Sequence, residues 1–220
     1  MAQMLYEDDS SQRHLDLVRR HQRRCRKTKG AAGYASKIEP ARAALEEKVA
    51  ATRRKREAEE DAGDDHGLAD ELQDDNVTTV WDRAGEFDRD NPGAGMQAKL
   101  FPSGRRTDVT EANIWIEPDE VDKIVSVLAG LPEDHPLRPL AEPLGEAAQG
   151  SRAAGEGVGK ALRQRKLAEG DEELAAADVR RAYERNYLNA RDVLGRKVAE
   201  RLFVKNKRRA KKKGSEGPAQ

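Results

Sequence analysis

Two stretches decide the fold: NARDVLGRKVAERLF, residues 189–203, and FDRDNPGAGMQAKLF, residues 87–101, which lies 102 positions earlier. Both contain Arg-Asp, a glycine three positions after that Asp, and a closing Leu-Phe. An ungapped alignment of residues 70–101 with residues 172–203 gives nine identities in 32 positions. Composition alone gives about two or three identities in an alignment of this length. The period exceeds the roughly 20–50 residues of solenoid repeats, so it predicts a tandem duplication of a domain-sized unit.

A weaker match at an offset of 103 extends the repeat upstream, pairing Glu39-Pro40 with Glu142-Pro143. The shift by one residue is what an insertion or deletion in a connecting loop produces. We therefore expect a first helical half over residues 1–104 and a linker over 105–117. A second helical half follows over 118–206, and residues 207–220 form a disordered basic tail.

The composition favours long, charged helices over sheet. The 220 residues are 37% charged and only 4% aromatic, and Ala, Glu, Lys, Arg and Leu are abundant. The abundance of Arg, Ala, Gly and Glu suggests a GC-rich bacterial coding sequence. The 41 basic and 41 acidic residues cancel, yet residues 57–75 hold ten acids and no Lys or Arg. The core is expected to be thin.

The apolar spacing predicts three helices in the first half. Residues 8–29 have Leu15, Val18, Gln22 and Cys25 on one face, with Gly30 and Gly33 as stops. A second helix is expected over 39–62, with Pro40 in its first turn, followed by a turn at 62–67. The third, over 68–90, is expected to end at Asn91-Pro92-Gly93 and to point its apolar residues inward: Leu68, Leu72, Val77, Val80 and Trp81.

The second half shows a similar order of elements. Residues 118–129 predict a short helix with Val121, Ile124, Val125 and Leu128 inward, and a Pro-rich connector follows over 131–143. A glycine-containing helix is expected over 143–168, and a long, straight closing helix over about 171–209. Between the halves, residues 112–116 form the only extended-looking run. The fold class is therefore all-α: two pseudo-repeated three-helix units, the third helix longest in each, forming an antiparallel helical bundle.

No arrangement of residues predicts catalysis, so we expect no enzyme, no cofactor, no metal and no small-molecule substrate. His14, His21 and Cys25 share one helical face, but no fourth metal ligand follows at a suggestive spacing, and a surface or interface stripe on an Arg-rich helix is the simpler interpretation. GSRAAGEGVGK, residues 150–160, lacks the Ser or Thr after Gly-Lys and the preceding strand of a phosphate-binding loop.

Two basic segments, 19–29 and 205–213, are candidates for polyanion binding, because Lys and Arg neutralise phosphates without sequence preference. They have no aromatic residues between the charges for base stacking. A lysine-rich end is also a common solubilising tail. The residues concerned are Arg19, Arg20, Arg23, Arg24, Arg26, Lys27, Lys207, Arg208, Arg209, Lys211, Lys212 and Lys213.

The preferred function is a non-catalytic helical scaffold or adaptor that associates with itself or with another protein, and the alternative is nucleic-acid or other polyanion binding. The aromatic residues are the expected packing anchors: Trp81, Phe101, Trp115, Tyr183, Tyr187 and Phe203. No signal peptide and no apolar run long enough for a membrane span are evident, so we expect a cytoplasmic protein.

Overall fold

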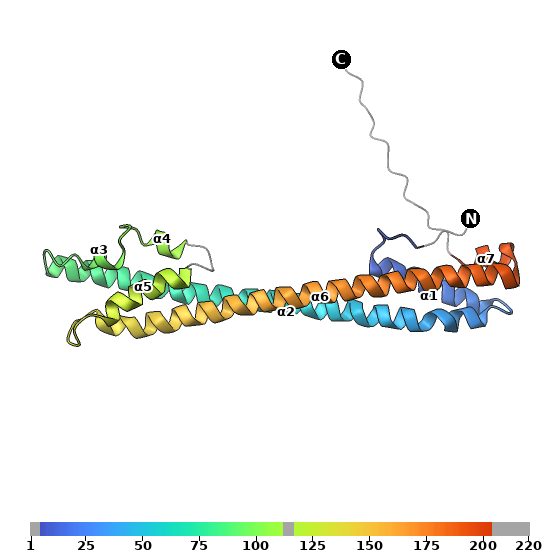
Figure 1. The fold of residues 1–220 in the computed structure, drawn as a ribbon, viewed down its shortest axis with the longest axis horizontal. Coiled ribbons are helices and arrows are strands. Elements are labelled where there is room, and N and C mark those ends of the chain that lie inside the picture. The colour runs from blue at the N-terminus through green and yellow to red at the C-terminus, as the bar shows by residue number, and fades with distance from the viewer. Residues whose placement is uncertain (1–4, 112–116, 204–220) are drawn as a thin grey trace, which may run out of the picture. The chain divides into compact units, whose positions relative to one another are not determined.

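The computed structural model describes residues 5–111 and 117–203, where helices are joined by turns and loops and no strand occurs (Figure 1). The predicted all-α class is confirmed. The elements in chain order are α1 (Ser11–Lys27), α2 (Ala32–Asp90), α3 (Met96–Leu100), α4 (Thr107–Thr110), α5 (Glu117–Ala129), the 3-10 turn η1 (Arg138–Leu140), α6 (Ala141–Leu194) and α7 (Arg196–Leu202). No helix within the described residues combines the length and the apolar character that a membrane span requires.

Helix α1 forms where the apolar spacing predicts it. The side chain of Ser10 accepts a hydrogen bond from the backbone N–H of Arg13 and so caps the first turn. Arg24, Arg26 and Lys27 occupy the last turn, where positive charge is favourable. The predicted apolar face is buried, as its residues Leu15, Val18, Gln22 and Cys25 show.

Helix α2 corrects the prediction of two helices separated by a turn. It runs unbroken for 59 residues, so residues 62–67 are helical, and Pro40 lies inside the helix and not in its first turn. Proline has no N–H to bond to the carbonyl of Ser36, but Ser36 is exposed and water can replace the donor. Gly33, expected as a stop, also lies within α2. The predicted end at Asn91-Pro92-Gly93 is confirmed.

The prediction of a straight helix continuing to residue 209 is wrong within the described residues. Helix α6 joins the predicted segments 143–168 and 171–194 into one element of 54 residues, then ends at Leu194. Gly195 adopts φ +80° and ψ 155°, a conformation outside the helical region that glycine reaches without a side-chain clash, and α7 begins after it. In both halves the second helix, not the third, is the longest.

The chain divides into two compact units that differ from the sequence halves. Unit 1 comprises residues 1–53 and 168–220, and unit 2 comprises residues 54–167. Each unit therefore contains residues of both halves. The boundaries predicted from the sequence remain a prediction about how a duplication arranged the chain. They are 1–104, 105–117, 118–206 and 207–220. The tail and the extended run 112–116 lie outside the described residues.

The core of unit 1 joins the start of α2 to the end of α6. Thr52 Oγ1 donates to the carbonyl oxygen of Ala168, Lys48 pairs with Asp171 at 2.7 Å, and the hydroxyl of Tyr34 donates to the carbonyl oxygen of Asn189. The residue numbers rise along α2 as they fall along α6, as expected of helices running in opposite directions. Helix α1 packs against α7 beside them.

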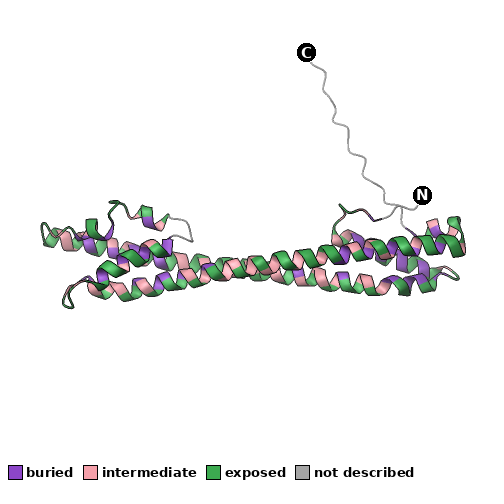
Figure 2. Ribbon diagram, viewed as in Figure 1, coloured by how far each residue is buried: buried purple, intermediate pink, exposed green. Residues whose placement is uncertain are grey.

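The core of unit 2 is built from the other ends of the same long helices. Val77, Val80 and Ala84 of α2 join Leu144 and Ala148 of α6 in one buried cluster. Helix α5 packs against α3, and it buries Val121, Ile124 and Leu128 as predicted, with Val125 partly buried. In each unit the buried residues gather where the short helices cover the long ones (Figure 2).

Candidate functional site

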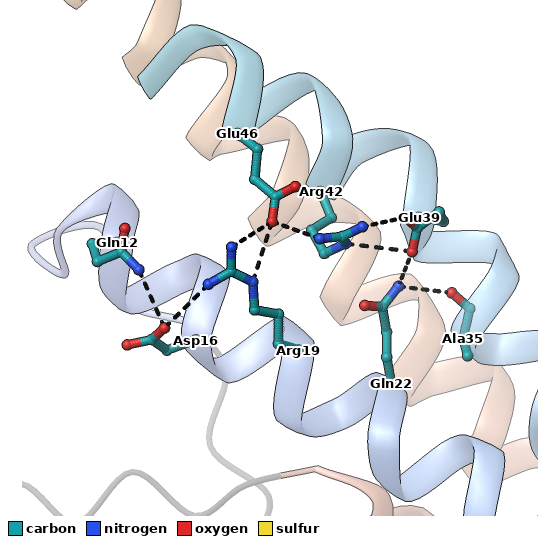
Figure 3. Close-up of polar contacts among 8 residues, drawn as sticks. All are labelled: Gln12, Asp16, Arg19, Gln22, Ala35, Glu39, Arg42 and Glu46. Atoms are coloured by element: carbon teal, nitrogen blue, oxygen red, sulfur yellow. Dashed lines mark hydrogen bonds and ion pairs between the residues drawn. The ribbon is translucent and has the colours of Figure 1, made fainter. Parts of the chain in front are cut away.

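The basic residues of α1 fall into two groups. Arg19 pairs with Glu46 at 2.8 Å and approaches Asp16 at 3.7 Å, so its charge is compensated within unit 1 (Figure 3). Arg24 Nη1 donates to the carbonyl oxygens of Arg201 and Phe203, each at 3.1 Å, and so caps the end of α7. These two residues have structural partners.

The remaining residues form a narrower surface than the sequence suggests. Arg20, Arg23 and Lys27 are exposed at a spacing of three and four, so they share one helical face, which we call the basic face. None of them has an ion-pair partner among the described residues. Arg26 lies elsewhere on the helix, near Glu39. The predicted residues Lys207, Arg208, Arg209, Lys211, Lys212 and Lys213 lie outside the described residues.

A polar network joins α1 to α2. Gln22 Nε2 donates to the carbonyl oxygen of Ala35 and to Glu39, and Arg42 bridges Glu39 and Glu46 (Figure 3). The hydrogen bonds from Arg42, and then from Gln22, lower the pKa of Glu39. This network fixes the rotation of α1 on α2, and with it the direction in which the basic face points.

His14, His21 and Cys25 are buried in unit 1 and do not form a surface stripe, and Cys25 Sγ lies 3.6 Å from the ring nitrogens of His21. His21 Nδ1 is 3.2 Å from the carbonyl oxygen of Leu202, and its ring lies 4.1 Å from that of Phe203. Burial lowers the pKa of His21 to about 4 and raises that of Cys25 to about 11, so both are neutral at pH 7. No group of three or more His, Cys, Asp or Glu side chains in the described ranges could hold a metal ion.

The predicted aromatic anchors make edge-to-face contacts at corresponding places in the two units. In unit 1, Tyr183 meets Phe203 at 4.8 Å between ring centroids with an interplanar angle of 83°, and Tyr187 also contacts Phe203. In unit 2, Trp81 meets Phe101 at 5.0 Å and 75°. Trp115 lies outside the described residues. Edge-to-face contacts of this kind stabilise a core beyond the area that they bury.

A buried carboxyl in unit 2 was not anticipated from the sequence. Glu117 is 3% exposed and accepts a hydrogen bond of 2.8 Å from Nε2 of Gln73, which is itself fully buried. Burial raises the pKa of Glu117 to about 7, and the nearby charges of Asp70 and Asp74 act in the same direction. Within so acidic a stretch, the sequence has no signal that distinguishes a buried carboxyl from the solvated ones.

A cavity of about 350 Å³ opens between α3, α4 and α5 in unit 2. Its walls are mainly apolar, and Lys123, which pairs with Glu120 at 2.6 Å, lies at its edge. Its other polar lining residues are Lys99, Ser103 and Asp108. The apolar lining residues are Leu100, Phe101, Pro102, Val109, Ile124 and Val127.

The long helices also expose leucines, contrary to part of the prediction. Leu68 and Leu72 of α2 are more than half exposed and not inward-facing, and on α6 so are Leu167 and Leu174. Leu68 and Leu72 lie one turn apart, on the same side as three exposed carboxylates: Asp61, Asp65 and Asp75. We call these five residues the acidic leucine face.

Comparison with known proteins gives no relative: the chain matches no protein-family model, no curated protein and no solved structure.

Proposed function

We propose that this protein is a non-catalytic helical scaffold that binds another protein or a second copy of itself through exposed leucines on its long helices. In this proposal, two copies of an ancestral three-helix unit form an antiparallel bundle, and each compact unit combines the beginning of one copy with the end of the other. The core of the bundle holds the helices in place, and their outer faces make the contacts.

The geometry around the repeated Leu-Phe supports the duplication. Gly93 and Gly195 correspond in the repeat, and both have positive φ, 93° and 80°. A short helix follows each of them, and each helix is followed by a buried phenylalanine, Phe101 or Phe203, against an aromatic ring of the preceding long helix. Tandem copies of one sequence are expected to keep such local geometry.

The upstream match also coincides with equivalent packing. At the offset of 103, Val18 corresponds to Val121 and Cys25 to Leu128, and all four are fully buried. Helix α1 packs against α7, and α5 packs against α3, so the first short helix of one copy covers the last short helix of the other. This exchange explains why each unit draws on both halves.

One observation carries the functional proposal: Leu72 and Leu174 are the same residue at corresponding positions, and they are 57% and 68% exposed. The other apolar identities in the repeat are buried: Val77/Val179, Leu100/Leu202 and Phe101/Phe203. An apolar side chain kept in both copies but excluded from both cores has no packing role inside the chain. A partner protein that covers it supplies one.

The proposal is tested by placing a photo-crosslinking amino acid at position 72 or 174 of the full chain in a cell extract. We expect covalent protein adducts from both positions. Val193 is the control because it is 75% exposed and its counterpart in the repeat is Asn91. Adducts at 193 as abundant as those at 72 and 174, or none at either leucine, would contradict the proposal.

The alternative is polyanion binding through the basic face, favoured by the three exposed cations of α1 that have no ion-pair partner among the described residues. The sequence adds seven bases and no acid over residues 205–213. Binding of duplex DNA that weakens steeply as salt is added would support it, because each phosphate contact releases a counterion.

A further inference from the structure

The zero net charge of the chain conceals a division between the two units. By sequence, unit 1 carries 26 basic and 16 acidic residues, a net charge of +10, and unit 2 carries 15 basic and 25 acidic residues, a net charge of −10. Fields of this size steer association between molecules, and they favour encounters of unlike units over like ones.

The acidic leucine face gives the negative unit a definite contact surface. Asp61, Asp65, Leu68, Leu72 and Asp75 follow the spacing 4, 3, 4, 3, so they form one stripe along α2. None of the three aspartates has an ion-pair partner among the described residues. The stripe therefore presents two apolar side chains between uncompensated carboxylates.

The basic face of α1 is complementary to this stripe in both charge and spacing. Arg20, Arg23 and Lys27 repeat at three and four residues, as the aspartates and leucines do. Arginine and lysine also carry methylene stems that cover apolar surface while the charged ends reach carboxylates. Asp16 is the acid on the same side of α1, and Arg19 lies 3.7 Å from it.

We propose that a second copy of this chain is the partner, with its basic face docked on the acidic leucine face of the first copy. The inference rests on the proposed scaffold function and names the partner of that surface. Repulsion disfavours a polyanion at the acidic leucine face, whereas a basic polypeptide complements its carboxylates. The chain itself supplies one in equal amount.

The test is sedimentation equilibrium of the full chain at low and high salt. The wild-type protein should exceed the monomer mass of 24.4 kDa at low salt and return to it at high salt, where surface charges are screened. The triple variant Arg20→Glu/Arg23→Glu/Lys27→Glu should be monomeric, as should Asp61→Lys/Asp65→Lys/Asp75→Lys. An equimolar mixture of the two should associate again, as should one chain carrying all six changes.

The matched control reverses three exposed carboxylates elsewhere in unit 2, Glu133→Lys/Asp134→Lys/Glu142→Lys, which changes the net charge equally and should leave association intact. Circular dichroism verifies that every variant stays helical. A wild-type chain that remains monomeric at low salt overturns the inference, and so does association that survives either reversal. Loss of association only on removal of residues 205–213 also overturns it, because the tail would then be the binding segment.

The two proposals fail in different ways. Adducts at Leu72 and Leu174 that contain another protein, together with a monomeric chain, would retain the scaffold and reject the second copy. Absence of adducts at both leucines would reject the scaffold itself.

Discussion

His21 is the residue at which the chemistry of the core most clearly departs from that of the isolated side chain. Its ring is fully buried between Phe203 and Tyr183, and burial lowers its pKa from 6.5 to about 4. Between these values the unfolded chain binds a proton that the folded chain does not. Stability therefore falls as the pH decreases from 6.5 to 4, by roughly 3 kcal/mol for a shift of this size.

We predict that the free energy of unfolding of unit 1 decreases over this pH window and that His21→Leu makes the slope shallower. His14 keeps part of the slope because burial lowers its pKa too. The measurement is amide hydrogen exchange of α1 and α7 at several pH values, corrected for intrinsic exchange rates. Amides of α5 in unit 2 should show the opposite trend, because the raised pKa of Glu117 makes that unit more stable as the pH falls from about 7 to 4.5. An unchanged slope in the variant would show that His21 is not the titrating group.

At the scale of the element, the continuity of α2 through residues 62–67 is the feature that most changes the fold. Gly63 and Gly67 have no positive φ, and a Cβ atom added to either would meet nothing within 4 Å. Each glycine in a helix interior costs about 1 kcal/mol relative to alanine. The helix therefore tolerates these residues, and local propensity does not favour them.

Gly63→Ala and Gly67→Ala should each stabilise the protein by about 0.5–1 kcal/mol in urea unfolding followed by circular dichroism. The opposite result is expected for Gly195→Ala, since residue 195 has φ +80° and an alanine there is strained. Destabilisation by the first two substitutions would indicate a turn with left-handed glycines, as the sequence alone suggests.

At the scale of the whole molecule, both compact units require residues from both halves of the chain. We predict that cutting the backbone between the halves does not separate them. A protease site inserted after Ser103, which is exposed, allows the purified chain to be cut in its folded state. The two fragments should then elute together from a size-exclusion column and separate only in denaturant. Separate elution of two folded halves would contradict the division into units described above.

The sequence by itself determined the helical class, the bounds of α1 and α5 to within a few residues, and the end of α2 at Asn91-Pro92-Gly93. These features depend on local spacing, caps and breakers, whose effects act within about one helical turn. It also identified some of the buried positions, such as Val18, Val77 and Leu128, because an apolar stripe needs only its own helix to be recognised.

For the candidate site, the sequence identified the cations of α1 but not which of them have partners. Arg19 and Arg24 are engaged by Glu46 and by the end of α7, while Arg20 and Arg23 are not, and this difference depends on residues up to 179 positions away. The exposure of Leu68 and Leu72 was likewise predicted wrongly. The helical spacing shows that these leucines share a face, but not whether another helix covers it.

Only the tertiary structure decided that Pro40 and residues 62–67 lie within one continuous helix, and that the beginning of each half packs with the end of the other. The low helix propensity of proline and glycine opposes helix formation at Pro40 and at residues 62–67 by a few kcal/mol at most. Packing along a 59-residue helix outweighs that preference, and it acts between residues that no local pattern connects.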